Sequence, residues 1–197
     1  MILEKKSTYI RKEEILQATL DVVGRKGVRA LTIAAISEAA GMSEANIYRH
    51  FGGKNEILEA LGNFIDTSVM GKAATIAGSS RKPLEKLETI FFSHLSLISE
   101  HPGIPRFVFS EDILLGQSEL AKTLSLRIKS YVETISGIIA AGIQEGDLRQ
   151  GISPRETALT LLGIIQFTAL RSTIGGLTFD INVEGRKLWN NLLRLIL

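Results

Sequence analysis

The chain has 197 residues, of which 45% are hydrophobic and 22% are charged. These proportions exclude an intrinsically disordered chain and suit a soluble globular protein of one or two domains. Lys and Arg outnumber Asp and Glu by only 23 to 21, which neither requires nor excludes a nucleic-acid partner. The sequence has no cysteine. Disulfides, thiolate metal sites and cysteine nucleophiles are therefore excluded, and the composition fits a reducing cytoplasm.

Neither a signal peptide nor a membrane span is predicted. The N-terminus carries charged residues where a signal peptide needs its apolar run. The longest mostly apolar stretch, residues 158–170, has 13 residues and is bounded by Glu156 and Arg171. A membrane-spanning helix needs about 18 to 20 apolar residues. We therefore expect a cytoplasmic protein that has no membrane partner.

Apolar residues recur at spacings of three and four along nearly the whole chain, and strict alternation is almost absent. This is the helical period, so the sequence predicts an all-α protein of about nine helices. The first three are short and are closed by glycines. We expect them around the apolar stripe 15–23 before Gly27, at 32–40 before Gly41, and from Ser43 to about 51–53.

Longer helices are expected from Lys54 onward. Their expected positions are 54–76, 83–98, a shorter segment to about 115, 120–146 with a break at Gly116 before it, 153–173, and 182–196 after a break at Gly175-Gly176. The change from short to long helices near residue 55 predicts two domains, residues 1–55 and residues 56–197.

Residues 32–51 have the proportions of a helix-turn-helix. Gly41 can adopt the positive φ that a tight turn needs, and Ser43 can cap the second helix by accepting a bond from a backbone N–H. Ile47 and Phe51 are expected to point inward, which leaves a mostly polar outer face. In this motif the second helix lies in the DNA major groove.

Several pieces of this region agree in register with a known family; they are residues 11–16, Gly27, 31–32, 39–43, 47–51 and Lys54. Over roughly residues 10–60 the chain resembles the N-terminal DNA-binding domain of TetR-family transcriptional repressors. The rest matches the family only in the number, order and lengths of its helices. The resemblance implies a larger C-terminal domain for ligand binding and dimerisation. It also implies a homodimer that binds double-stranded DNA at a palindromic operator and is released by a small-molecule inducer.

The resemblance also assigns roles to individual residues. Phosphate contacts are implied for Thr32, Tyr48, His50 and Lys54, and base contacts for Glu44, Ala45, Asn46 and Arg49. The chemistry agrees, because the first four can donate hydrogen bonds to phosphate oxygens and Arg and Asn can pair with purine edges. Tyr48 could instead simply pack at the edge of the domain.

A basic N-terminal arm is also expected; it consists of Lys5, Lys6, Arg11 and Lys12. Such an arm could reach phosphates or the minor groove, or could be only a solvated terminus. Gly53 stands where the family often has a capping serine, so the helix that begins at Lys54 is expected to have a weaker cap.

The larger domain is expected to hold an inducer between apolar walls, and a hydrophobic ligand such as a fatty-acyl compound would fit. The pocket candidates are Phe91, His94, Tyr131, Gln166 and Arg171. For His94 and Phe91, an ordinary position in the core is the alternative.

The last two helices are apolar on more than one face and are expected to form the dimer interface, where Gly163 would allow close approach. The interface candidates are Leu161, Ile165, Leu188, Trp189 and Leu192. A buried central helix followed by an ordinary C-terminal helix is the alternative.

An enzyme is not expected. His94 and His101 lie seven residues apart, unlike the zinc pair of an HExxH motif, and no nucleophile elbow or phosphate-binding glycine loop is present. We therefore predict no cofactor and no metal. The remaining alternative is a DNA-binding activator or a chromosome-organising protein of the same fold. For a repressor, the helix that begins at Lys54 would join the DNA surface to the pocket wall, so that ligand binding tilts it.

Overall fold

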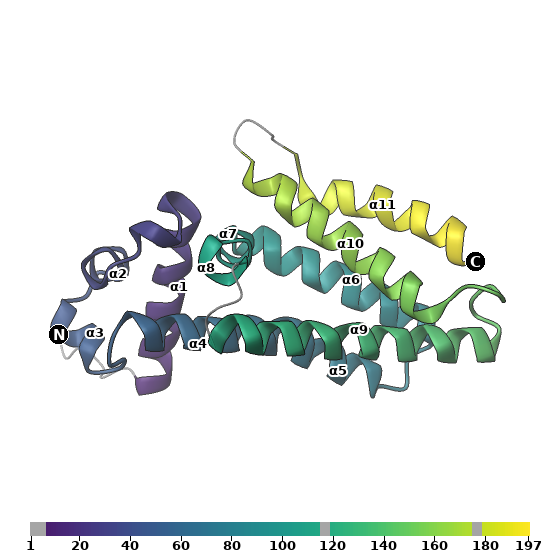
Figure 1. Ribbon diagram of the computed structural model, residues 1–197, viewed down its shortest axis with the longest axis horizontal. Coiled ribbons are helices and arrows are strands. Elements are labelled where there is room, and N and C mark those ends of the chain that lie inside the picture. The colour runs from purple at the N-terminus through teal and green to yellow at the C-terminus, as the bar shows by residue number, and fades with distance from the viewer. Residues whose placement is uncertain (1–6, 115–118, 175–178) are drawn as a thin grey trace, which may run out of the picture.

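The computed structural model describes residues 7–114, 119–174 and 179–197, and its regular elements over these residues are all helices (Figure 1). This confirms the all-α prediction. The helices form a small unit, α1 to α3, at one end and a longer bundle, α5 to α11, at the other (Figure 1). Helix α4 runs from the first unit into the second. Within the described ranges, no helix is both long and apolar enough to cross a bilayer.

The small unit consists of α1 (Thr8–Lys26), the short η1 (Val28–Ala30), α2 (Ile33–Ala40) and α3 (Glu44–Tyr48). Each α-helix begins after a hydroxyl side chain that accepts a hydrogen bond from a backbone N–H three residues later. The capping residues are Ser7, Thr32 and Ser43. The apolar face of each helix points to a common core, which includes Ile15, Ile36, Ile47 and Phe51.

The predicted helix 54–76 is interrupted by a π-helical turn. It consists of α4 (Lys54–Asp66), the π-turn η2 (Thr67–Gly71) and α5 (Lys72–Ala77). Single π-turns inside α-helices frequently occur at functional sites. The sequence pattern did not indicate this turn, because its apolar residues keep a helical spacing throughout.

The large unit contains α6 (Pro83–Glu100), α7 (Gly103–Val108), α8 (Glu111–Leu114), α9 (Glu119–Glu145), α10 (Pro154–Thr173) and α11 (Ile181–Ile196). Proline occupies the first position of α6 and α10, where its missing N–H costs nothing. Helix α9 packs on α6 and α10, and α11 packs on α6 and α10. With α4–η2–α5 counted as one helix and α7–α8 as one, the described residues form the nine expected helices. The expected breaks at Gly116 and Gly175-Gly176 lie outside the described residues.

The two units meet where α1 crosses α7. At the crossing Gly103 lies directly against the backbone of α1, and a Cβ atom on Gly103 would overlap the carbonyl oxygen of Leu20. Gly24 faces the same point, and a Cβ atom there would lie 3.3 Å from the Gly103 nitrogen. Near this crossing Phe64 of α4 packs edge-on against His101, with ring centroids 5.9 Å apart. The small unit is therefore held against α7 as well as through α4.

Candidate DNA interface and ligand cavity

The turn between α2 and α3 has the geometry of a helix-turn-helix. Gly41 has φ 61° and ψ 35°, the left-handed conformation that glycine adopts without steric cost. The Ser37 hydroxyl donates a 2.6 Å hydrogen bond to the Met42 carbonyl oxygen and so braces the turn. Sequence reasoning identified Gly41 and Ser43 but missed Ser37, because a serine inside a helix carries no distinctive signal.

Helix α3 turns its polar face to solvent. Ile47 is fully buried and Phe51, just after the helix, is 2% exposed, so both anchor the helix inward. Of the predicted base-reading residues, Glu44, Ala45 and Arg49 are exposed and Asn46 is half-buried. The structure therefore leaves this face open to a nucleic-acid groove.

The predicted phosphate-binding residues lie at the start of α2, on α3 and after it, and at the start of α4. Thr32 accepts a 3.1 Å hydrogen bond from the Ala35 N–H, which leaves its own O–H free to donate. Tyr48 is 54% exposed, which argues against a packing role within the protomer. His50 and Lys54 are half-buried, and the Nδ1 atom of His50 has no hydrogen-bond partner within the described part of the chain.

The start of α4 is capped differently from the family pattern. Gly53 has no side chain to offer, but the Glu56 carboxylate accepts a 2.6 Å hydrogen bond from the Gly52 N–H. The Lys12 ammonium lies 3.9 Å from Glu56 and 4.7 Å from the centre of the Phe51 ring. These contacts fix the start of α4 to both α1 and the end of the helix-turn-helix.

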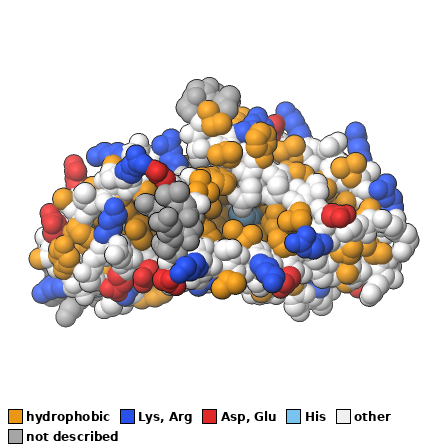
Figure 2. Space-filling view, viewed as in Figure 1, with side chains coloured by type: hydrophobic (Ala, Val, Ile, Leu, Met, Phe, Trp, Pro, Cys, Tyr) orange, Lys and Arg blue, Asp and Glu red, His pale blue; other side chains and the backbone are white. Residues whose placement is uncertain are grey.

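The structure corrects the predicted N-terminal arm. Arg11 and Lys12 belong to α1, where Arg11 pairs with Glu14 at 2.8 Å and Lys12 contacts Glu56 and Phe51. They are parts of the fold because α1 is capped at Ser7, before both of them. Lys5 and Lys6 lie outside the described residues. Positive and negative side chains are interspersed over the small unit on the face shown in Figure 2. DNA affinity would therefore depend on local placement of donors.

His94 of α6 and Tyr131 of α9 form a buried polar pair inside the large unit. The His94 Nδ1 and Tyr131 hydroxyl oxygen are 3.3 Å apart, and both residues are almost fully covered. Burial lowers the pKa of His94 to about 4 and raises the pKa of Tyr131, because each charged form would lose its hydration. His94 is therefore neutral at physiological pH, and the pair links α6 to α9.

This pair predicts a pH-dependent contribution to stability. In the unfolded chain His94 regains its ordinary pKa of 6.5 and takes up a proton more readily than in the folded protein. The contribution is thus fully present above pH 6.5 and is lost as the pH falls toward 4. Between pH 7 and pH 4 the wild type should lose roughly 3 kcal/mol more than His94→Gln. Urea unfolding of both proteins across this range measures the difference, and parallel curves would contradict the assignment.

The other pocket candidates have structural partners. Phe91 is fully buried and packs on Trp189, with ring centroids 5.2 Å apart, so it belongs to the core. Arg171 pairs with Glu184 at 3.1 Å and lies over the Phe179 ring, and Gln166, also on α10, is half-buried. None of these residues, nor His94 or Tyr131, lines the small apolar cavity between α4, α7–α8 and α9, and a pocket shared by the five stays a prediction.

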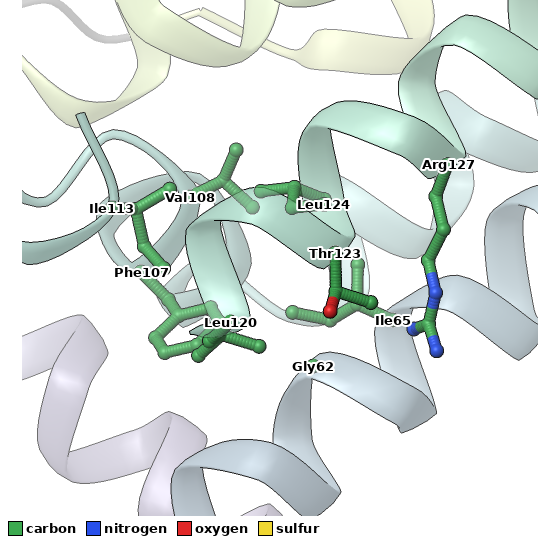
Figure 3. A pocket seen from close by; sticks show the side chains of 9 residues that line it. All are labelled: Gly62, Ile65, Phe107, Val108, Ile113, Leu120, Thr123, Leu124 and Arg127. Carbon is green, nitrogen blue, oxygen red and sulfur yellow. The ribbon is translucent and has the colours of Figure 1, made fainter. Parts of the chain in front are cut away.

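That cavity lies between α4, α7–α8 and α9 (Figure 3). Its walls are mostly apolar, and Arg127 is the only charged residue among the described residues that line it; the others are Gly62, Ile65, Phe107, Val108, Ile113, Leu120, Thr123 and Leu124. Its volume is about 10 Å³, which is room for about one water molecule. The site is therefore closed in this structure. Sequence reasoning missed it because its lining comes from three separate stretches of the chain.

The structure also corrects the predicted dimer residues. Leu161, Ile165, Trp189 and Leu192 are at most 3% exposed within the protomer, so they have almost no surface to offer a partner; Leu188 is half-buried. A different apolar stripe on α10 and just beyond it is exposed; it consists of Leu159, Gly163, Phe167, Leu170 and Ile174. An interface on this helix stays a prediction, and any such interface would have to use the exposed stripe and not the four buried residues.

A helix-turn-helix with an open second helix, joined by one helix to a larger helical unit with an apolar cavity, defines a DNA-binding regulator. Comparison with known proteins agrees. Residues 15–61 match the family model for bacterial regulatory proteins of the tetR family, and residues 57–195 match that for the YsiA-like protein C-terminal region. The chain belongs to the TetR family of transcriptional regulators.

The names of individual relatives and structural neighbours refer to different roles and ligands. Nucleoid occlusion factor SlmA of Marinobacter nauticus is 31% identical over 150 residues, which are 75% of this chain and 74% of that protein. The ketosteroid regulator KstR2 of Mycobacterium tuberculosis has a TM-score of 0.77 and 21% identity over 94% of both chains. FadR of Bacillus subtilis, solved with stearoyl-CoA, has a TM-score of 0.72 and 21% identity over 92% of this chain and 97% of that one. The structural matches establish the fold.

Proposed function

We propose that the protein is a cytoplasmic homodimeric repressor that binds a palindromic operator and is released by a hydrophobic small-molecule inducer. The observation that carries this proposal is the exposed face of α3, whose outward residues can reach base edges while Ile47 anchors the helix. Residues 1–55 would read the DNA and residues 56–197 would bind ligand and partner. One copy of so small a unit covers few base pairs. In a two-fold symmetric dimer, the two α3 helices would bind two half-sites whose centres are about 34–36 Å apart.

The release step is supported by the position of the cavity. Gly62 and Ile65 of α4 form one of its walls, and the same helix begins beside α3 at Lys54. A ligand that enlarges the cavity must therefore displace at least one of its walls, which are α4, α7–α8 and α9. Movement of α4 would change the separation of the two α3 helices in a dimer. A coupling free energy of about 1–3 kcal/mol would weaken operator binding about 5- to 150-fold.

A chromosome-organising role is the second candidate, because the SlmA relative is 31% identical over most of its length. In that role the protein would bind DNA at sites spread over the chromosome, and no ligand would be needed to release it. An activator would bind at promoters but would raise transcription.

Selection of bound duplexes from a random pool tests these proposals. The purified full-length protein, at near-physiological salt, is expected to enrich an inverted repeat. Lauroyl-coenzyme A should then release the protein from that repeat. Enrichment without release by this or other apolar ligands, with genomic sites away from promoters, would favour the chromosome-organising role. Recovery of unenriched DNA would overturn sequence-specific binding.

Substitutions in the interface should separate base reading from phosphate binding. Tyr48→Phe and Lys54→Ala are expected to weaken binding to all duplexes alike, because each removes a donor to phosphate. Arg49→Ala should instead relax the preference at one base pair per half-site, at a cost of about 1–3 kcal/mol on the preferred sequence. Titration of the selected operator and its single-base variants measures both effects. An equal loss on every duplex for Arg49→Ala would refute its base-reading role.

A further inference from the structure

Arg127 of α9 forms a clasp with α4 at the edge of the cavity. One guanidinium nitrogen donates to the Asn63 side-chain oxygen at 3.1 Å, and another lies 3.3 Å from the Asp66 carboxylate. Figure 3 shows this side chain reaching from α9 toward α4, beside the apolar lining. The Arg127 and Asp66 side chains are 30% and 28% exposed, so the pair is partly shielded from water.

The clasp holds α4 at its C-terminal end, directly before the π-turn. Asp66 is the last residue of α4, and the π-turn Thr67–Gly71 follows at once. One turn before Asp66, Gly62 lies so close to α9 that a Cβ atom there would be 2.6 Å from the Leu120 Cδ1 atom. Helix α9 is therefore seated tightly on α4 on one side of the cavity and held by Arg127 on the other. A ligand that pushes α9 away from α4 must therefore break the clasp.

We infer that Arg127 is the anion-recognition residue of the ligand site and that its transfer from Asp66 to the ligand releases α4. The inference rests on the proposed repressor function. A guanidinium binds carboxylate and phosphate groups through paired hydrogen bonds, so an incoming anion competes directly with the Asp66 carboxylate. The apolar walls would take the rest of the molecule. The ligand class is thus an amphiphilic anion, with an apolar chain and a carboxylate or phosphate head.

The closed cavity identifies the state that the clasp stabilises. In this structure the clasp is formed and the cavity beside it has room for about one water molecule. In the proposed repressor, this closed arrangement would be the one that binds DNA. Loss of the clasp should therefore mimic ligand and weaken operator binding by about fivefold or more. Substitutions of Asp66 and of Arg127 should have opposite effects on the affinity for the anion. Asp66 holds Arg127 only in the closed state, whereas Arg127 acts in the closed state and in the liganded one.

Two variants test this separation. Asp66→Asn removes the competing carboxylate but keeps Arg127, so operator binding should weaken and binding of laurate or lauroyl-coenzyme A should tighten. Arg127→Gln should weaken operator binding to a similar extent and also weaken binding of both anions by about tenfold. Uncharged lauryl alcohol has no head group for Arg127, so loss of the clasp alone should let it bind Arg127→Gln at least as tightly as the wild type. Tighter binding of laurate would indicate a carboxylate head, and tighter binding of lauroyl-coenzyme A would indicate a phosphate head.

The matched control is Glu184→Gln, which breaks the Arg171–Glu184 pair. That pair has nearly the same exposure, 32% and 26%, and joins α10 to α11 away from α4. The Glu184→Gln variant, once its folding and oligomeric state have been verified, should bind operator and ligand with the affinities of the wild type. If neither anion releases the wild type from its operator, the ligand-release function itself fails and the inference fails with it. If an anion releases the wild type and Arg127→Gln at equal concentrations, only the role of Arg127 fails.

Discussion

Replacing Gly103 with alanine is expected to destabilise the protein by about 1–3 kcal/mol and to weaken operator binding. The added Cβ atom would overlap the Leu20 carbonyl oxygen, which belongs to helical backbone and cannot rotate away. Helix α1 must therefore move off α7, and the small unit would change its position relative to the large one. Urea unfolding and operator titration measure the two consequences.

Two other glycines provide the comparison. Gly137→Ala, on the exposed side of α9, meets no atom within 4 Å and should stabilise the helix by about 0.5–1 kcal/mol. Gly24→Ala meets the Gly103 nitrogen at 3.3 Å, so a shift of a few tenths of an ångström suffices and the loss should be smaller than for Gly103→Ala. If Gly103→Ala were as stable as Gly137→Ala, the close crossing of α1 and α7 would be wrong.

The helix-turn-helix could be predicted from sequence because its determinants are local. The left-handed turn at Gly41, the Ser43 cap and the inward positions of Ile47 and Phe51 all depend on neighbours within a few residues. The joint between the units could not be predicted in this way. Gly103 and Leu20 are distant in sequence, and a glycine near a helix start has many ordinary explanations. The Arg127 clasp was missed for the same reason, because Asp66 and Arg127 meet only after α4 and α9 have packed.

The faces of the long helices were also beyond sequence reasoning. Periodicity indicates that α10 has two apolar sides but not which side meets the protomer core. The structure buries Leu161 and Ile165 against the rest of the bundle and leaves Leu159 and Phe167 outside. His94 and Tyr131 were correctly singled out as inward polar residues. Their mutual hydrogen bond, however, depends on how α6 and α9 cross, and that geometry has no signature in either helix alone.

The exposed stripe of α10 predicts that Phe167→Asp converts the protein to monomers. Phe167 is 62% exposed in the protomer, so the substitution should leave folding intact. In the proposed two-fold interface the stripe of one protomer covers that of its partner. A carboxylate buried there would lose its hydration without gaining a counter-charge, which costs several kcal/mol. Sedimentation of the wild type and the variant tests the change in mass.

Operator binding should fall by about 100-fold or more in the same variant, because each α3 helix would then bind its half-site without the gain from a linked partner. Leu126→Asp is the matched control, since Leu126 is 70% exposed and belongs to α9, not to the exposed stripe of α10. It should remain dimeric and keep its operator affinity. If Leu126→Asp dissociated the dimer and Phe167→Asp did not, the interface would belong to α9. A dimer built on α9 would place the Arg127 clasp beside the partner subunit, and ligand release would then have to act through subunit contacts as well as through α4.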